Sequence, residues 1–350
     1  MSSAHEPDWP SLDALLRRDP GGRGVAAFIQ GGQPLAMGHL ESASRELAQR
    51  GRSVAIVTGF AIVTGFAIVG RDPPAAETDG PPGALHLARV LAALGVETAL
   101  ITDSVGLPLL EAGRRCGGLE STRLLEFPLA RDPAVSDAWI EDFLTSPAGA
   151  GLTHLVSIER VGPSHTLESL AAQPRSGLPP IADFEREVPP EHRDRCHNMR
   201  GVVIDDCTAP IHRLFEAVAA RRAEVKTIGV ADGGNEIGMG ALAWEMVRRA
   251  IARGPAGQIA CRIPTDFLIL AGVSNFGAYA LAAAVAVLRG RAELLSAWTA
   301  DAERRLIETL VRDAGAVDGI TGMSQPTVDG LPLDEYLATL TAIGNAAAGA

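Results

Sequence analysis

The stretch VKTIGVADGGNEIGMGALAWEMV, residues 225–247, combines the three local patterns that decide the fold. Val225–Val230 is a short, largely apolar run, as is typical of strands that are buried on both faces. A glycine-rich turn, DGGNEIGMG, comes next, and a helical pattern begins after the turn. A strand that leads through a tight turn into a helix is part of a βαβ unit, and such units build parallel sheets with right-handed crossovers.

The same unit recurs along the chain without any repeat of its residues. Further strand-like runs are VETALIT (Val96–Thr102), HLVSIE (His154–Glu159) and DFLILAG (Asp266–Gly272). Helical spacing separates them: one pattern has apolar residues at 84, 87, 88, 91 and 94, and another follows residue 210. We therefore predict an α/β fold with a mostly parallel, doubly wound, Rossmann-like sheet and helices on both of its faces.

We expect a single α/β domain over residues 1–350. Residues 1–50 predict a helical lead-in, residues 51–290 the sheet core, and residues 291–350 a helical C-terminal extension with two Asp-Gly turns. Residues 164–200, inside the core, are polar, proline-rich and too long for a plain connection. The sequence leaves open whether this insertion is a disordered linker or an ordered lid over an active site.

A tandem duplication lies at the start of the predicted core. AIVTGF occurs at Ala55–Phe60 and again at Ala61–Phe66, and a third copy begins as AIVG. As one strand this stretch would span roughly 50 Å, whereas strands usually span about 17–20 Å. Because six is an even number, a shift by one copy keeps every side chain on the same face. We predict that one copy forms a central strand and the other is surplus chain; a β-hairpin turning at Thr-Gly is the alternative.

The composition argues against several classes of protein. Hydrophobic residues make up 47% of the chain and the net charge is −11, which is opposite to the basic face of nucleic-acid binders. No apolar run is long enough to cross a membrane, and the N-terminal segment lacks the layout of a signal peptide. The four cysteines form no CxxC pair, which favours reduced thiols over disulfides or a zinc site. We predict a cytoplasmic protein that binds neither nucleic acid nor membrane.

Candidate site residues follow the predicted strands, at the sheet edge where ligands bind in open α/β folds. Thr78 and Asp79 precede a helix whose first turn holds two prolines, and either side chain can simply cap that helix. Asp79 beside the glycine turn also brings a carboxylate to the edge of the sheet. Glu159 and Arg160 leave the strand at 154–159, either as a solvated charge pair or as site residues.

The turn after Val230 carries the most specific pattern. Gly233 and Gly234 allow backbone angles that other residues avoid, so the N–H groups of the turn can cradle an anion. Asp232, Asn235 and Glu236 place polar side chains beside this cradle. The turn contains no GKS or GKT and no GxGxxG with a distant acidic partner, which argues against a triphosphate or dinucleotide site. A purely structural glycine turn is the alternative.

Three further polar residues complete the candidate set. Ser274 and Asn275 lie where the run Asp266–Gly272 passes into a helix, and Asn198 lies in the insertion. They either cap local structure or join the same rim. The whole set is rich in carboxylates and backbone donors, which suits a small charged substrate and a divalent cation such as Mg²⁺ or Mn²⁺. The residues that would hold such a metal are not specified by the sequence.

Several motifs together resemble one known family. TGF, ETDGPPGA, SIERVG, NMRG, IDD, GVADGGNEIGMG, AGVSNFGAYAL and the closing VDG…TVDGL are similar to the C-terminal domain family of D-glutamate cyclase. The resemblance covers about Asp19 to Leu340. Two departures stand out: the eukaryotic cyclase carries another large domain ahead of this region, and here a second AIVTGF intervenes before ETDGPPG.

The resemblance implies a hydro-lyase that closes D-glutamate to 5-oxo-D-proline and releases water. Its partner is then a small anionic amino acid, and a homo-oligomer is left open. We expect the catalytic residues to be Asp79, Glu159, Asp232 and Glu236, and the substrate-binding residues to be Thr78, Arg160, Asn198, Gly233, Gly234, Asn235, Ser274 and Asn275. The alternatives are another small-molecule hydrolase or lyase on this scaffold, or a non-catalytic metabolite-binding domain.

Overall fold

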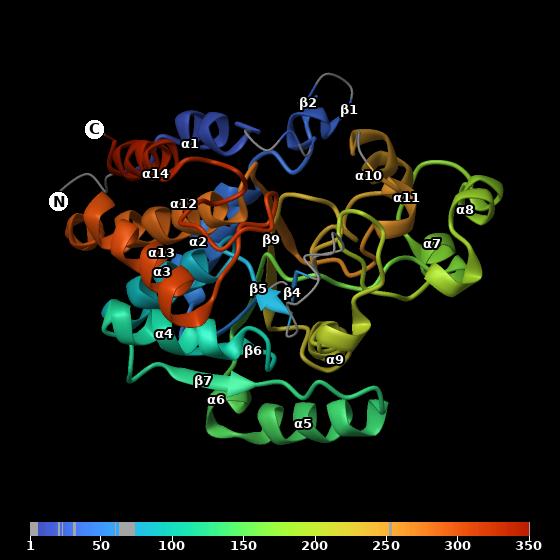
Figure 1. The fold of residues 1–350 in the computed structure, drawn as a ribbon, viewed down its shortest axis with the longest axis horizontal. Coiled ribbons are helices and arrows are strands. Elements are labelled where there is room, and N and C mark those ends of the chain that lie inside the picture. Colours follow the sequence, from blue (N-terminus) through green and yellow to red (C-terminus); the bar gives the residue numbers. More distant parts are fainter. Residues whose placement is uncertain are drawn as a thin grey trace.

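Six parallel strands form the central sheet of the protein (Figure 1). The computed structural model describes residues 6–19, 22, 24–30, 33–59, 61–62, 74–251 and 254–349. Within these residues the sheet has the order β10-β9-β8-β3-β6-β7, and every neighbouring pair is parallel. Its strands are β3 (Ser53–Thr58), β6 (Glu97–Thr102), β7 (Arg123–Glu126), β8 (His154–Ile158), β9 (Lys226–Ala231) and β10 (Phe267–Leu270).

The strand order is that of a doubly wound Rossmann-like sheet. The chain starts at β3, moves outward through β6 and β7, and then returns to β8 on the other side of β3 before moving outward through β9 and β10. The direction of winding therefore reverses between β3 and β8, and such a switch point is where open α/β sheets bind ligands. The predicted fold class is confirmed.

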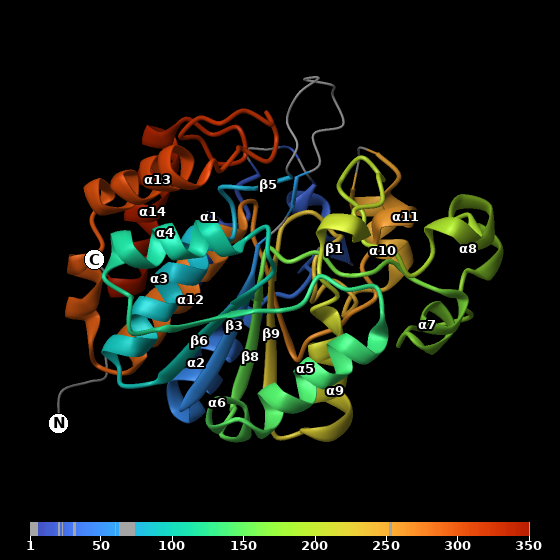
Figure 2. The ribbon, with the colours of Figure 1, turned by 60° about the horizontal axis from the view of Figure 1, so that its bottom comes forward.

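Two hydrophobic cores lie on opposite faces of this sheet. In β3, Val54 and Ile56 join one core while Ala55 and Val57 join the other, as the period of two in a strand requires. Figure 2 shows the resulting layers, with α2, α3, α4 and α12 on one side of the strands and α5 and α9 on the other. Burial on both faces explains why the middle of the inner strands, such as Val54–Val57, is apolar.

The first layer includes α12, α13 and α14, which have 15, 15 and 16 residues. It contains α1 (Trp9–Leu16), α2 (His39–Arg50), α3 (Pro81–Ala93), α4 (Leu107–Gly117), α12 (Ser274–Leu288), α13 (Ala300–Ala314) and α14 (Leu333–Ala348). The second layer contains α5 (Pro133–Thr145), α6 (Pro147–Ala150), α9 (His212–Arg221), α10 (Trp244–Ala250) and α11 (Ala256–Ile259). The two helices whose apolar spacing the sequence indicated are α3 and α9.

The N-terminal segment is less helical than predicted. Between α1 and α2 lie a 3₁₀ turn, η1 (Val25–Ala27), and a small antiparallel pair, β1 (Ile29–Gln30) with β2 (Gln33–Pro34). Two-residue strands carry too little periodic pattern to be distinguished from a loop in the sequence.

The insertion at 164–200 is ordered, so the linker alternative is wrong. It contains α7 (Leu167–Ala172), α8 (Ile181–Glu187) and η2 (Pro190–His192), which lie at the opposite end of the molecule from α13 and α14 (Figure 1). Thr166 and Ser169 form a capping box at the start of α7. After Arg291 come η4 (Ala292–Ala297), α13 and α14, as predicted for the C-terminal extension.

The first copy of the duplicated AIVTGF enters the central strand, as predicted. Residues Ala55–Thr58 belong to β3, which lies between β8 and β6. The second copy starts as β4 (Ala61–Ile62), paired antiparallel with β5 (Ala75–Ala76) outside the main sheet. The remainder of the second copy and the AIVG of the third lie outside the described residues.

Two further expectations can be compared with the structure. All four cysteines are free, with Cys116 exposed and the other three buried. Among the described residues, no helix combines the length and the apolar character that crossing a bilayer requires.

The strand β7 was not predicted, because it is a short edge strand of only partly buried residues.

Candidate functional site

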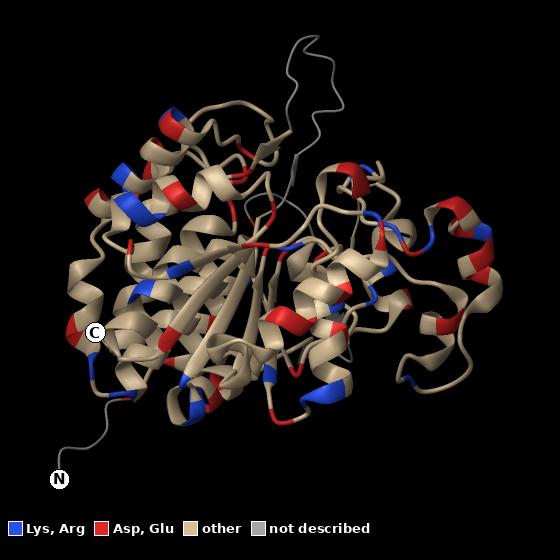
Figure 3. Ribbon diagram, turned by 90° about the horizontal axis from the view of Figure 1, so that it is seen from below, with Lys and Arg blue, Asp and Glu red and all other residues tan. Residues whose placement is uncertain are grey.

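The switch point of the sheet brings carboxylates together from separate parts of the chain. Glu159 directly follows β8, Asp232 directly follows β9, and Asp79 lies just before α3. Asp329 comes from the loop between α13 and α14. Figure 3 shows acidic positions in the connections near the strand ends. The rule that parallel strands end at one edge therefore accounts for the meeting of Glu159 and Asp232.

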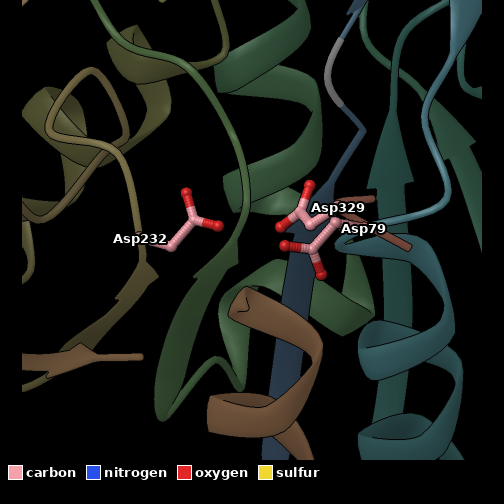
Figure 4. Close-up of side chains that lie close together, drawn as sticks. All are labelled: Asp79, Asp232 and Asp329. Carbon is pink, nitrogen blue, oxygen red and sulfur yellow. The ribbon is translucent and has the colours of Figure 1, made fainter. Parts of the chain in front are cut away.

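Five buried carboxylates form two overlapping groups. Asp79, Asp232 and Asp329 have carboxylate oxygens within 4.8 Å of one another, and so have Glu159, Asp232 and Glu236. Asp232 belongs to both groups. Figure 4 shows its carboxyl group facing those of Asp79 and Asp329. The predicted catalytic residues Asp79, Glu159, Asp232 and Glu236 thus share one site, well within the length of a small ligand.

Asp79 is held at the N-terminus of α12, and it also accepts from the N–H of Gly80 (2.9 Å), directly before α3. Its two carboxylate oxygens accept hydrogen bonds from the backbone N–H groups of Ser274 (2.8 Å) and Asn275 (2.7 Å). In return, the side-chain oxygen of Asn275 accepts from the N–H groups of Gly80 and Gly83, both at 2.9 Å. The alternative that Thr78 or Asp79 simply caps α3 is therefore wrong: two prolines begin α3 without N–H groups, and Asn275 accepts from Gly83 and shares the N–H of Gly80 with Asp79.

Glu159 is buried in an unusual backbone conformation. Its φ is 48°, in the left-handed region that residues other than glycine rarely adopt. One carboxylate oxygen accepts a 2.5 Å hydrogen bond from the hydroxyl of Ser274. Burial raises the pKa of Glu159 well above its usual value, and the neighbouring Asp232, Glu236 and Asp79 raise it further. The raised pKa favours the protonated form of Glu159 over that of an ordinary glutamate.

The glycine cradle is occupied by the chain itself. The N–H groups of Gly233 and Gly234 donate to the two oxygens of Glu236, at 2.8 and 2.7 Å. The cradle predicted from the sequence is thus formed, but its anion is the Glu236 carboxylate. Positive φ at Gly234 (100°), together with contacts that a Cβ would make with Ile251 and Val247, explains why glycine is needed there.

Asp329 was not predicted as a site residue, although the closing motif TVDGL contains it. It has a φ of 53° and is buried. The next residue, Gly330, donates its N–H to Asp318, which also accepts from the N–H groups of Ile320 and Thr321. This hydrogen bonding fixes the loop that presents Asp329. The signal in the sequence was the pair of Asp-Gly turns, one of which supplies Asp318 and the other Asp329.

Thr78 joins the Asp329 loop to the edge of the sheet. Its N–H donates to the carbonyl of Val317 and its hydroxyl to the carbonyl of Thr327. Its own carbonyl accepts from the side-chain amide of Asn275. Thr78 is therefore a structural tie between the loops that carry Asp79 and Asp329.

Arg160 is buried and paired, so the alternative of a solvated Glu159–Arg160 pair is wrong. Its guanidinium lies 2.7 Å from Asp103 and donates to the carbonyls of Gly59 and Ala209. It links the ends of β3, β6 and β8. A substrate carboxylate would have to compete with Asp103 for this cation, and breaking a buried pair of this kind is costly.

The two remaining predicted residues differ in their surroundings. Asn235 is buried and donates through its side chain to the carbonyl of His197 in the insertion. Asn198 uses its side-chain oxygen in a local turn, where it accepts from the N–H groups of Arg200 and Val202. Its side chain is thus engaged in the structure of the insertion.

The donor set fits a hard divalent cation. Carboxylate oxygens are the ligands that Mg²⁺ and Mn²⁺ prefer, and here they converge from four segments of chain. Buried carboxylates so close together repel one another unless protons or a cation neutralise them. Asp79, Asp232 and Asp329 would hold a cation. Glu159 and Glu236 lie next to this group, because they form the second carboxylate group with Asp232.

Comparison with known proteins agrees with this architecture. A family model described as D-glutamate cyclase-like, C-terminal, matches residues 12–173 and 185–344. The chain belongs to the D-glutamate cyclase-like C-terminal family. The matched region includes all five carboxylates of the site, and its gap falls within the insertion that carries α7 and α8.

A curated member of this family is the human protein D-glutamate cyclase, mitochondrial. It is 33% identical over an alignment of 350 residues, which covers 92% of this chain and 48% of the human protein. The chain therefore spans about half the length of the curated relative that it matches. The prediction of a cytoplasmic location stays a prediction.

Proposed function

We propose that the carboxylate cluster is the active site of a D-glutamate cyclase-like hydro-lyase, which converts D-glutamate to 5-oxo-D-proline and water. The observation that carries this proposal is the position of Asp232, which belongs to both carboxylate groups at the switch point of the sheet. Membership of the D-glutamate cyclase-like family supports the choice of reaction. The small anionic amino acid is the partner that this chemistry requires.

The reaction sets two tasks for the protein. The α-amine of the substrate must lose a proton before it attacks, and the γ-carboxyl group must lose an oxygen as water. Because amine and carboxyl group belong to one molecule, holding them close together removes much of the entropic cost of ring closure. What remains for the side chains is to move protons between defined atoms.

The environments of the carboxylates suggest their division of labour. We assign the role of base to Asp232, which is central to both groups and takes the proton from the substrate ammonium. In all, the nitrogen loses two protons and the departing oxygen gains two. Glu159, whose pKa is raised by burial, gives that oxygen one proton, and Asp232 gives it the proton taken from the ammonium, so that water leaves; the proton that the nitrogen loses after its attack restores Glu159. Ser274 holds the Glu159 carboxyl group in place. Two carboxyl groups in different surroundings can thereby act as base and acid in one site.

A divalent cation, Mg²⁺ or Mn²⁺, is the proposed cofactor, and Asp79, Asp232 and Asp329 would hold it. When bound, it supplies charge that neutralises the carboxylates and polarises the substrate carboxyl group. This neutralisation also explains how an anionic substrate enters a site lined with acidic side chains. Glu236, held by two backbone N–H groups, keeps the turn after β9 in place beside Asp232.

The proposal is tested by incubating the purified chain with D-glutamate, L-glutamate and the two 5-oxoprolines, with and without Mg²⁺ or Mn²⁺. We expect 5-oxo-D-proline to form from D-glutamate in the presence of a divalent cation. The variant Asp232→Asn should lower turnover by a factor on the order of 10² or more. The matched control is Asp301→Asn, on the exposed face of α13, which should leave turnover unchanged.

The outcomes separate the proposal from its alternatives. Binding of D-glutamate without turnover, in the presence of either metal, would indicate a metabolite-binding domain. Equal turnover in Asp232→Asn and in the parent protein would remove Asp232 from the mechanism. In both variants, melting curves establish that a loss of turnover does not reflect a loss of fold.

A further inference from the structure

A second cavity lies in the first helical layer, apart from the carboxylate site. It has a volume of about 410 Å³ and is bounded by α3, α12 and α14 together with η4 and the start of α13. Its polar lining includes hydroxyl, amide and imidazole groups, and its apolar lining is aliphatic and aromatic. No Asp, Glu, Lys or Arg of the described chain lines it. Its size and mixed lining are those of small-molecule sites.

His86 is the central polar group of this cavity. The residue is 5% exposed, and its ring packs edge-on against Tyr279 and Trp298, with centroid distances of 4.9 and 4.6 Å. Burial lowers the pKa of His86 to about 3, so the ring is uncharged at neutral pH. Among the described residues, its buried Nδ1 has no hydrogen-bond partner. Nδ1 is closed off from solvent, so a ligand in the cavity can meet only the small exposed part of the His86 ring.

The two rings beside His86 are fixed from behind by a buried carboxylate. Glu303 accepts hydrogen bonds from the hydroxyl groups of Tyr279 and Tyr336 and from the indole N–H of Trp298. The Glu303 carboxyl group is therefore bound by these three donors and does not face the cavity. The result is a rigid arrangement of three flat rings around a space without charged side chains, which favours a flat and neutral ligand.

We propose that this cavity is a binding site for an uncharged, planar small molecule that exchanges a hydrogen bond with His86. The lining itself offers a charged ligand no counter-charge, because Arg89 is held outside it, over the Trp298 ring (4.9 Å) and against the carbonyl of Ala297. The amino-acid substrate of the proposed function is charged, which separates the two sites chemically. The inference stands on the cavity alone and does not depend on the proposed reaction.

Gly344 provides a way to close the cavity. It lies in α14, lines the cavity, and has no atom within 4 Å of the position that a Cβ would take. Gly344→Leu should therefore fill the space without a clash at its Cβ, while Gly344→Ala fills little of it. Ala338→Leu, on the exposed face of the same helix, adds the same side chain outside the cavity. His86→Leu removes the imidazole but keeps an apolar group of similar size.

The experiment measures binding of benzamide and of its anionic counterpart, benzoate, by saturation-transfer NMR and calorimetry. We expect benzamide to bind the parent protein at least ten-fold more tightly than benzoate. Gly344→Leu and His86→Leu should each weaken benzamide at least five-fold, whereas Gly344→Ala and Ala338→Leu should not. Undetectable benzamide binding, equal binding of benzoate, or unchanged affinity in both Gly344→Leu and His86→Leu would overturn the proposal. Circular dichroism identifies any variant that fails to fold, and the remaining variant then decides.

Discussion

Asp79 caps α12, the helix that carries Asn275, and Asn275 in turn caps α3, the helix that follows Asp79. Asp79 precedes α3 but accepts two N–H groups at the start of α12, and Asn275 is the second residue of α12 but accepts two N–H groups at the start of α3. The two helices are thereby locked together at the edge of the sheet. Both oxygens of Asp79 thereby have backbone donors, and its position at a helix N-terminus is a favourable one for an acidic side chain.

The first prediction concerns this exchange. Asn275→Ala should lower the free energy of unfolding by about 1–3 kcal/mol, because the buried N–H of Gly83 loses its acceptor and the carbonyl of Thr78 loses a donor, while the N–H of Gly80 keeps Asp79. The matched control is Asn198→Ala, since Asn198 also accepts two backbone N–H groups but at an exposed turn. That control should cost less than about 1 kcal/mol. Urea unfolding measures both values, and similar losses in the two variants would show that the exchange adds no special stability.

The second prediction concerns pH. The pKa of Glu159 is raised in the folded state above the unfolded value of about 4.5, so the folded state binds more protons in that range. Stability should therefore fall as the pH rises from 4.5 toward the folded pKa, and level off above it. Glu159→Gln should be the more stable protein at neutral pH and should show a shallower fall. Urea unfolding between pH 5 and pH 8, with a chelator present, measures this difference.

A second buried acid contributes to the same pH range. The pKa of Glu303 is raised to about 7 by burial. This group therefore also makes the free energy of unfolding fall as the pH rises from about 4.5 to about 7. The pH dependence of stability that remains in Glu159→Gln should come from Glu303. If the parent and Glu159→Gln have parallel stability curves, Glu159 does not carry the extra proton.

The third prediction concerns the cation. Asp329→Asn should weaken Mn²⁺ binding about ten-fold or more, because one of three carboxylates is lost. Asp301→Asn, on exposed α13, serves as the control and should bind Mn²⁺ as the parent does. Calorimetric titration gives the affinities, and the rise in melting temperature with Mn²⁺ provides an independent readout. Undiminished binding in Asp329→Asn would place the metal elsewhere.

The fourth prediction concerns the duplication. Deleting Ala61–Phe66 removes β4, but the residues that then follow Phe60 are again Ala and Ile, from the third copy. These can pair with β5 in the same register, so we expect the deletion variant to fold at least as stably as the parent. Its activity should be kept or improved. A melting temperature several degrees lower, or insoluble protein, would show that both copies are structural.

The parts of the fold that could be predicted are those governed by local patterns. Strands β3, β6, β8, β9 and β10 are buried on both faces, so their sequences are nearly continuous apolar runs. Glu159 and Asp232 could be placed together because strands that run in parallel end at one edge. The edge strand β7 and the pair β1–β2 lack such patterns and were missed.

The parts that could not be predicted depend on which distant groups meet. Asp329 reaches the site through a loop tied to Thr78, and no strand leads to it. Asp103 neutralises Arg160 from the end of β6, a pairing that no spacing in the sequence reveals. The glycine turn was recognised, but its occupant was not, because the choice between Glu236 and an external anion is made by side-chain geometry.

The occupied glycine turn has a consequence for which ligands can bind at this edge of the sheet. The strand order is the one that nucleotide-binding folds use, yet the two N–H groups that would grip a phosphate already hold Glu236. A carboxylate tethered three residues away acts as an intramolecular competitor, present at a very high effective concentration. A free phosphate would have to displace it and then tolerate the neighbouring acids. One side chain thereby fills the anion-binding N–H groups of this turn, so an external anion can use them only by displacing Glu236.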